Sequence, residues 1–445
     1  MLLGLPGCAA ESPLPQIAPP VVKTAAASPA APAPSPIAAA PMPELPACEP
    51  LSSAGFERPR SEQVPLGNAP IQGGDTLAPF YEALARLERG LQKDHVRIGF
   101  HGDSNLTKDS LTGEMRRALQ SRFGDTGHGF LAPLRAWGWY THEDAQQGND
   151  AWWRVLAISA PRAPDMGYGV SGIAAEAHAV GARTWFSTAG DKSRFGRRAS
   201  KVGVFWRAQP GGGKFRVEID GEVQEEVSTA ADATGPGHKL YEVEDSPHRV
   251  DLVTTSADAV RLLGVYFERG EPGVIVDSFG VGGVYFQALT LDDHALNRAM
   301  EKQRRHDLVV YWLGANPHHS HEYARDVKLV VAERRKDDPT LPILVIGPPD
   351  AVIRLGDAAS DPSSRSLTQR LGQAAHDNGC AFWNMREAQG ADGSAAKFLK
   401  SGLATDRQHL SIAGSRLMAH LFLHELWKDY RRYLAEHPRA GCDPR

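Results

Sequence analysis

The sequence lacks several features that would assign it to a common functional class. Only four of its 445 residues are cysteine and no two form a Cys-x-x-Cys pair, which argues against zinc ribbons and thioredoxin-like redox sites. No apolar run reaches the roughly 18–20 residues that span a bilayer. Its 49 basic and 53 acidic residues almost cancel and form no basic stripe, so we expect no nucleic-acid partner.

The N-terminal segment lacks aromatic residues, since the first of them is Phe56. Residues 11–50 hold 12 of the 32 prolines and are otherwise mostly Ala, Ser and Val. Such a segment buries too little apolar surface to offset its ordering entropy. We therefore predict that residues 1–55 form an extended, disordered tether.

Cysteine positions suggest an exported protein. Leu5-Pro6-Gly7-Cys8 resembles the lipobox of bacterial lipoproteins, which implies a membrane tether through a lipidated Cys8 and a periplasmic, outer-membrane or cell-surface location. The alternative is an ordinary disordered N-terminus. Cys48 and Cys442 flank the globular part, and we predict a disulfide between them, as expected in an oxidising compartment. Cys380 is predicted to be a buried core residue.

Strand and helix patterns alternate in two parts of the chain. Apolar spacing predicts helices over 76–93 and 107–123, with a strand at 96–100 before the second. The C-terminal third repeats this rhythm, with strands at 307–314, 342–349 and 380–385 and helices at 324–336, 366–378 and 411–435. The alternation predicts an α/β fold, a parallel sheet with helices on both faces.

Residues 150–270 break this pattern, because they are rich in glycine and in short alternating runs. Residues 201–227 suit three strands joined by a Gly-rich turn and an Asp-Gly turn, and 239–269 look similar. We predict an all-β sandwich inserted into the α/β domain. The expected parts are the tether (1–55), the first part of the α/β domain (56–149), the insert (150–270) and the second part (271–445).

A candidate catalytic set is spread along the α/β segments. The stretch FHGDSNLT (100–107) places Ser104 in a turn after a strand. A nucleophilic serine needs a general base, an acid that orients the base, and donors for the oxyanion. Asp406 and His409 lie three residues apart just before the last helix, a spacing that lets the carboxylate accept from one imidazole nitrogen while the other faces the serine.

Oxyanion donors are available in two further stretches. The Gly-rich FGVGGVYF (279–286) can present the backbone N–H of Gly283, and LGAN (313–316) ends a strand with the side-chain amide of Asn316. Taken singly, Ser104 can be a turn residue, Gly283 a tight turn and Asn316 a cap. Their order along the chain, each beside a predicted strand or helix, favours one catalytic site.

This order resembles the SGNH hydrolase family, also called GDSL-like esterases. Gly102-Asp103-Ser104 is similar to the first family block, Gly283 to the second-block glycine, Gly314-Ala315-Asn316 to the third block, and Asp406 with His409 to the fifth. The resemblance implies a three-layer, flavodoxin-like sheet with Ser104 as nucleophile. It also implies that Ser104, Gly283 and Asn316 line the oxyanion hole, without a metal or cofactor. Asp103, Asn105 and His101 are further candidates for the pocket.

The 179 residues from Ser104 to Gly283 hold the β-rich insert (283 − 104 = 179). A sandwich inserted at this point resembles the bacterial peptidoglycan O-acetylesterases, and the implied substrate is an O-acetylated cell-wall or other extracellular glycan. We expect a monomeric esterase. Two alternatives stay open: a polysaccharide O-acetyltransferase that uses the same site, and a non-catalytic glycan-binding protein.

Three other groups of residues allow two interpretations each. His318, His319, His321 and Glu322 suit either a metal site or a solvated loop. His101 and His128 can line the pocket or satisfy hydrogen bonds in loops. Tryptophans of the insert can stack on sugar rings or pack in its core; these are Trp152, Trp153, Trp185 and Trp206.

Overall fold

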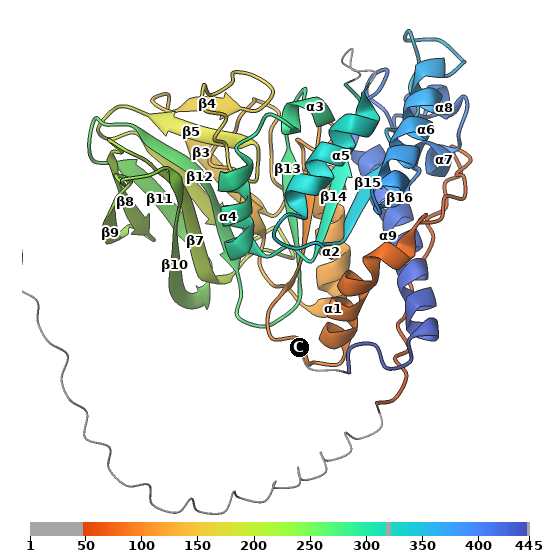
Figure 1. Cartoon of the computed structure of the whole chain (residues 1–445), viewed down its shortest axis with the longest axis horizontal. Helices are drawn as coiled ribbons and strands as arrows, with labels where there is room; N and C mark the ends of the chain where they lie inside the picture. The colour runs from red at the N-terminus through yellow and green to blue at the C-terminus, as the bar shows by residue number, and fades with distance from the viewer. Residues whose placement is uncertain (1–47, 317–321, 443–445) are drawn as a thin grey trace, which may run out of the picture. The chain divides into compact units, whose positions relative to one another are not determined.

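Five parallel strands form the central sheet, in the order β13-β1-β14-β15-β16. They are β1 (Val96–Gly102), β13 (Val274–Gly280), β14 (Leu308–Trp312), β15 (Ile343–Ile346) and β16 (Ala381–Trp383), drawn in Figure 1. Ile98 of β1 pairs with Val276 of β13 on one side and with Leu308 of β14 on the other. Strand β1, which leads into Ser104, is therefore an interior strand, although its neighbours are more than 170 residues away in sequence.

The computed structural model describes residues 48–316 and 322–442. Cys8, the predicted tether up to residue 47, and His318, His319 and His321 lie outside the described residues. Among the helices that are described, none combines the length and the apolar character that crossing a bilayer requires.

Helices pack on both faces of the parallel sheet. Alternate residues of β1, such as Ile98 and Phe100, share one apolar cluster with Met115 and Phe422, which belong to helices α2 and α9. The residues of β14 and β15 that point to the other face, such as Val309, share a second apolar cluster with side chains of α5 and α6. Both faces are buried, as a parallel sheet requires. The first face carries α1 (Ala78–Glu88), α2 (Ser110–Phe123) and α9 (Ile412–Glu436). The second carries α3 (Phe286–Leu289), α4 (His294–Arg304), α5 (Tyr323–Arg334) and α6 (Pro362–Asp377).

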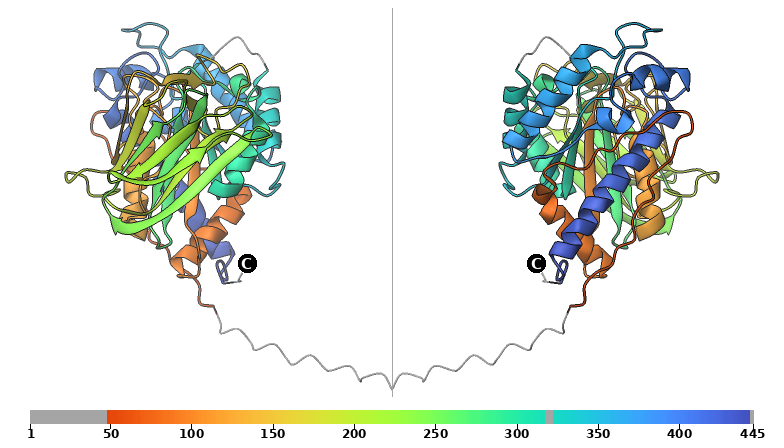
Figure 2. Two further views of the ribbon diagram at one scale, coloured as in Figure 1. Left: turned by 90° about the vertical axis from the view of Figure 1, so that its left-hand side faces the viewer. Right: turned by 90° about the vertical axis from the view of Figure 1, so that its right-hand side faces the viewer.

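Three short helices complete the α/β part: the 3-10 helix η1 (Gly74–Leu77), α7 (Met385–Gln389) and α8 (Ser394–Lys400). The long final helix α9 is the blue helix that crosses the right-hand view of Figure 2. Its N-cap is Ser411, whose side chain accepts from the N–H of Gly414. The helix predicted over 107–123 begins only at Ser110, because residues 104–108 form the turn that carries Ser104.

Two antiparallel sheets form the additional β region. One has the order β10-β7-β12-β5-β4, with β2 also paired to β12, and the other has the order β3-β6-β11-β8-β9. Their strands are β2 (Gly129–Leu131), β3 (Ala145–Asn149), β4 (Arg154–Ala157), β5 (Ile173–Ala177), β6 (Arg183–Thr188), β7 (Ala199–Ala208), β8 (Lys214–Ile219), β9 (Glu222–Ser228), β10 (Gly235–Ser246), β11 (Arg249–Thr254) and β12 (Val260–Glu268). Side chains from both sheets, such as Val204 and Val217, share one core. The mixed architecture expected from the sequence, a parallel sheet plus an extra β region, is confirmed.

Buried ion pairs join the two kinds of sheet. Arg304 of α4 donates to both carboxylate oxygens of Asp277 on β13, at 2.6 and 2.8 Å, and it also pairs with Glu268 on β12. Arg97 of β1 donates to the same Glu268 at 2.9 Å. Removing one residue of such a pair would leave a buried charge unpaired and would lower the free energy of unfolding by roughly 3–5 kcal/mol. The network therefore fixes β12 of the antiparallel sheet against the parallel sheet.

The two ends of the folded part are covalently joined. Cys48 and Cys442 form the predicted disulfide, with their Cα atoms 6.2 Å apart and a sequence separation of 394. Cys380 is a free and buried thiol, as expected. A bridge of this length constrains almost the whole described chain in the unfolded state.

Candidate active site

The Ser104 turn is fixed at the carboxyl end of β1. The backbone N–H of Asp103 donates to the carbonyl of Trp312 on β14, and the hydroxyl of Thr107 donates to the carbonyl of Ser104 at 2.7 Å. Gly102 is required here, because a Cβ at this position would lie 2.8–2.9 Å from side-chain carbons of Leu106. The turn thus brings Ser104 to the edge of the sheet where ligands of α/β proteins bind.

Ser104, His409 and Asp406 are hydrogen-bonded in series. Ser104 Oγ lies 2.7 Å from His409 Nε2, and His409 Nδ1 lies 2.8 and 2.9 Å from the two carboxylate oxygens of Asp406. Because the carboxylate accepts from Nδ1–H, the lone pair of Nε2 faces the serine hydroxyl. This is the arrangement of nucleophile, base and orienting acid that acyl transfer requires.

The loop before α9 holds Asp406 in its ionised form. Asp406 accepts from the backbone N–H groups of Gln408 and His409, both at 3.0 Å, as well as from the imidazole. Burial raises the pKa of Asp406, but these hydrogen bonds outweigh it, so that the pKa lies below its ordinary value. A short bond from the N–H of Thr405 to the carbonyl of His409 closes the loop.

Asp103 and Asn105, the neighbours of Ser104, connect it to the other loops of the site. Asp103 is buried and accepts from the N–H groups of Gly314 at 3.3 Å and Ala315 at 3.0 Å, directly before Asn316. Asn105 accepts from the N–H of Leu410 at 3.0 Å and donates to the carbonyl of Gln408 at 3.3 Å. Asp103 therefore sets the position of the Asn316 loop, and Asn105 sets the position of the His409 loop.

The two predicted oxyanion residues lie in loops that meet. Asn316 Nδ2 donates to the carbonyl of Val284 at 3.4 Å, next to Gly283. The loop before Gly283 is fixed to the nucleophile strand by a bond from the N–H of Val281 to the carbonyl of Gly102, at 2.9 Å. Gly283 has φ of 77°, a left-handed conformation that favours glycine. Both loops are thus anchored to residues 102 and 103, directly before Ser104.

Ser104 opens into a cavity of about 250 Å³. Its lining includes Asn105, Lys108, Trp139, Asp406, His409 and Ile412. Sequence reasoning missed Trp139 and Lys108, because neither belongs to a motif or to a periodic pattern; the only signal was the short Trp-Gly-Trp stretch at 137–139.

Two of the three pocket candidates do not line this cavity. Asp103 is buried beneath the turn, whereas Asn105 lies in the lining as expected. His101 lines a different and smaller cavity, where Arg334 hydrogen-bonds its Nε2 and Tyr311 lies against its ring. The reason is the alternation of a strand, because Phe100 and His101 point to opposite faces. Burial and the nearby Arg334 charge keep the pKa of His101 well below its ordinary value.

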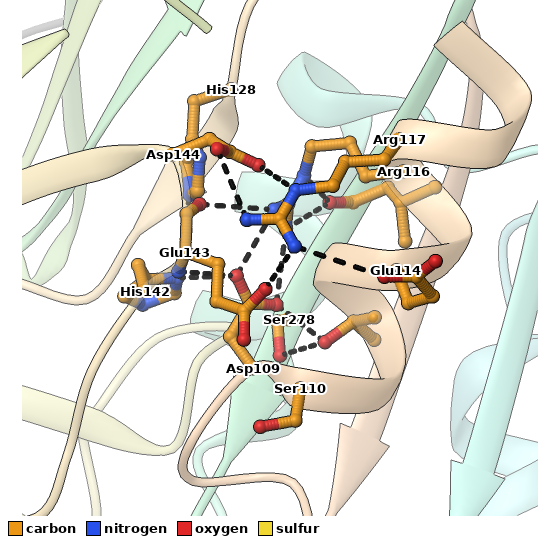
Figure 3. A network of polar contacts seen from close by, with 12 residues as sticks. Asp109, Ser110, Glu114, Arg116, Arg117, His128, His142, Glu143, Asp144 and Ser278 are labelled. Atoms are coloured by element: carbon orange, nitrogen blue, oxygen red, sulfur yellow. Dashed lines mark hydrogen bonds and ion pairs between the residues drawn. The ribbon is translucent and has the colours of Figure 1, made fainter. Parts of the chain in front are cut away.

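His128 belongs to a buried network behind the site. Together with Asp109 and His142 it forms a group whose ligand atoms lie within 4.8 Å of one another (Figure 3). The carboxylate of Asp109 already accepts two bonds from the guanidinium of Arg116, at 3.0 and 3.1 Å. A metal ion would have to share this carboxylate with a fixed positive charge. We therefore interpret the group as structural. His128 does not line the Ser104 cavity, and its Nε2 lies 3.4 Å from Nδ1 of His142.

The four tryptophans of the β region differ in environment. Trp153 is buried in the core between the antiparallel sheets, and Trp206 packs at its edge against Phe215. The guanidinium carbon of Arg249 lies over the ring of Trp185, 4.3 Å from the ring centre. Trp152 is 68% exposed and lines neither of the two cavities described. Core packing therefore accounts for Trp153 and Trp206.

Comparison with known proteins gives a structural match. No protein-family model and no curated protein matches the sequence. A solved structure of a peptidoglycan O-acetylesterase is similar over 81% of this chain and 99% of its own, with a TM-score of 0.64 and 22% sequence identity.

Two more distant matches add no argument because of their low TM-scores. A Bacillus subtilis protein matches with 14% identity and a TM-score of 0.32, over 68% of this chain and 97% of its own. A family two carbohydrate esterase from Clostridium thermocellum matches with 14% identity and a TM-score of 0.24, over 62% and 98%. The chain therefore has the fold of a peptidoglycan O-acetylesterase over almost the whole length of that enzyme.

Proposed function

We propose that this chain is a serine esterase of the SGNH type that removes O-acetyl groups from an extracellular glycan, with cell-wall peptidoglycan as the substrate. The observation that carries the proposal is the hydrogen-bonded series of Ser104, His409 and Asp406 at the end of an interior strand. The fold shared with a peptidoglycan O-acetylesterase supports the choice of substrate.

The first half of the reaction forms an acetyl-serine. Ser104 Oγ attacks the ester carbonyl carbon while His409 Nε2 takes the hydroxyl proton. The carbonyl oxygen becomes negative and is stabilised by N–H donors from Ser104, Gly283 and Asn316. When the C–O bond to the sugar breaks, the imidazolium returns its proton to the sugar oxygen, and the deacetylated glycan leaves.

The second half repeats these steps with water. His409 removes a proton from a water molecule, whose oxygen attacks the acetyl carbon. The tetrahedral intermediate then expels Ser104 Oγ, which recovers its proton from His409, and acetate is released. Asp406 remains ionised throughout, since its pKa is lowered by the loop that holds it, and stabilises the imidazolium in both halves.

The same proposal places the protein outside the cytoplasm. A disulfide between Cys48 and Cys442 suits an oxidising compartment, where an esterase would meet cell-wall polymer. Lipidation of Cys8 would tether the enzyme near that polymer. Labelling of the expressed protein with a clickable fatty acid, beside Cys8→Ser, tests this part separately.

Acetate release from O-acetylated peptidoglycan tests the proposed activity. We expect release by the wild type and a loss of at least about 10³-fold in kcat/KM for Ser104→Ala. Ser415→Ala is a matched control, because Ser415 lines the same cavity but belongs to α9. Equal rates for wild type and Ser104→Ala, or no release by the wild type, would contradict the proposal.

A further inference from the structure

An exposed tryptophan stands at the mouth of the Ser104 cavity. Trp139 is 54% exposed and lines that cavity together with Ser104 and His409. Single exposed apolar side chains are ordinary on a protein surface, but this one lines the cavity of the nucleophile and has a second indole beside it. Trp137 lies parallel to it, with 13° between the ring planes and 6.3 Å between the centroids. Of these two nearly parallel indole rings, Trp139 lies beside the nucleophile and Trp137 packs behind it on the apolar cluster.

The loop that carries Trp139 is rigidly built. Arg135 donates to the carbonyls of Gly138 at 2.9 Å and Tyr140 at 3.0 Å, on either side of Trp139. The N–H of Thr141 donates to the carbonyl of Thr107 at 3.1 Å, in the turn that follows Ser104. Trp139 is thus held at a fixed position relative to the nucleophile, so that little entropy is lost when a ligand binds.

The polar network in Figure 3 joins the end of this loop, at His142 and Glu143, to Asp109. Tyr140 is buried, and its hydroxyl lies 3.1 Å from Nε2 of His142. The N–H of Glu143 donates to the carboxylate of Asp109 at 2.9 Å, and Asp109 is paired with Arg116 of helix α2. The first contact joins two residues of the loop, and the second fixes the loop to Asp109, the residue before the first turn of α2.

The same loop reaches the predicted oxyanion donor. A Cβ at Gly282 would lie 3.5–3.7 Å from three atoms of the Trp137 ring, so this ring covers Gly282 directly before Gly283. Trp137 also packs against the apolar cluster on the second face of the parallel sheet, the face that carries α3 to α6. Trp137 therefore lies against the oxyanion loop, while its neighbour Trp139 lines the nucleophile cavity.

We infer that Trp139, supported by Trp137, is a stacking subsite for the pyranose ring that carries the scissile acetyl ester. This inference rests on the proposed esterase function and names the feature that favours a sugar ester over a simple ester. One face of a pyranose is a patch of C–H groups with slightly positive hydrogens, which complements the negative face of an indole. A ring on Trp139 would place its ester beside Ser104, within a cavity that holds a small acyl group.

The test compares two acetate esters of different shape. One is a soluble fragment of O-acetylated peptidoglycan, and the other is triacetin, an acyclic ester without a sugar or aromatic ring. For Trp139→Ala we expect the ratio of kcat/KM values, glycan over triacetin, to fall about tenfold through a higher KM for the glycan. Trp139→Phe keeps an aromatic face and should recover much of the ratio.

Leu91→Ala is the control, since Leu91 is a large apolar side chain with the same 54% exposure as Trp139 but does not line the cavity. It should keep the wild-type ratio. The inference is overturned if Trp139→Ala changes the ratio by less than about twofold, or if both esters lose activity equally, which would indicate a structural role.

Binding measurements separate a failure of the inference from a failure of the proposed function. If the wild type hydrolyses neither ester, the proposed function fails, and the subsite is tested by binding alone. De-O-acetylated peptidoglycan fragments are titrated into wild type and Trp139→Ala by calorimetry. Affinity about tenfold weaker in Trp139→Ala supports the subsite, and equal affinity overturns it.

Discussion

A single carboxylate decides which nitrogen of His409 carries the proton. Asp406 accepts from Nδ1–H, which leaves Nε2 free to receive the proton of Ser104. The hydrogen bonds from Gln408 and His409 that outweigh burial keep the pKa of Asp406 below its usual value. Asp406 is therefore ionised throughout the neutral range, and its charge is available when the imidazolium forms.

Asp406→Asn should remove most of the activity without unfolding the protein. An amide can donate to Nδ1 and so favours the wrong imidazole tautomer, and we expect kcat to fall about 10²–10⁴-fold with a small change in KM. Steady-state acetate release measures both constants. The control is Asp191→Asn, which changes an aspartate that is almost fully exposed in an antiparallel-sheet loop. A kcat within a few-fold of wild type would exclude an orienting role.

At the scale of elements, the loop from 132 to 144 depends on buried histidines. Burial lowers the pKa of His142 to about 4, although the nearby Asp109 opposes this shift, while Arg116 adds to it. Its neighbour His128 is also buried, and burial likewise keeps the pKa of His128 well below its ordinary value. Both imidazoles are therefore neutral in the folded protein near pH 7, and protonation opposes folding.

The free energy of unfolding should consequently fall as the pH is lowered from about 6.5 towards 4. In that window the unfolded chain binds a proton on His142 and the folded chain does not, so lowering the pH stabilises the unfolded state relative to the folded state. In His142→Gln the loss of stability between pH 7.5 and 5.5 should be smaller by about 1 kcal/mol. Urea unfolding at the two pH values measures this. Equal losses in variant and wild type would show that His142 titrates normally in the folded state.

The sequence predicted elements well where a pattern was regular. Helix α5 and the strand–turn–strand run from β7 to β9 lie where spacing placed them, because periodicity reports which face is buried. Strand β5, with the sequence Ile-Ala-Ala-Glu-Ala, is buried on both faces and shows no alternation, so it was not found. Strands β2 and β3 precede residue 150 and still pair in the antiparallel sheets.

The site was predictable to the extent that it follows a motif. Ser104, His409 and Asp406 were selected by their order along the chain, and the structure brings them within hydrogen-bond distance. Trp139 was not selected, because an exposed aromatic residue in a loop has no periodic signature. His101 was only a candidate for the pocket. It lines the other cavity, because Phe100 beside it faces the helices on the α9 side and adjacent strand residues point to opposite faces.

At the scale of the whole molecule, the bridge between Cys48 and Cys442 closes a loop of nearly the full described chain. Replacing both cysteines with serine should lower the free energy of unfolding by roughly 2–5 kcal/mol, because the unfolded chain regains entropy. The rate constant of the folded enzyme should stay near the wild-type value, since neither cysteine lines the Ser104 cavity.

Denaturant unfolding with and without a reductant measures this effect. Wild type under reducing conditions should match the double variant, because Cys380 is already a free thiol. An unchanged midpoint after reduction of the wild type would show that the bridge adds no stability.

The most direct test of the account is the location of the acetyl group during turnover. The enzyme is mixed rapidly with p-nitrophenyl acetate, quenched with acid and digested with trypsin, which cuts after Arg97 and Lys108. The account predicts a burst of p-nitrophenol and one acetyl ester on the peptide 98–108, at Ser104, with neither in Ser104→Ala. Turnover at the wild-type rate by Ser104→Ala, or an acetyl ester on another residue, would contradict it.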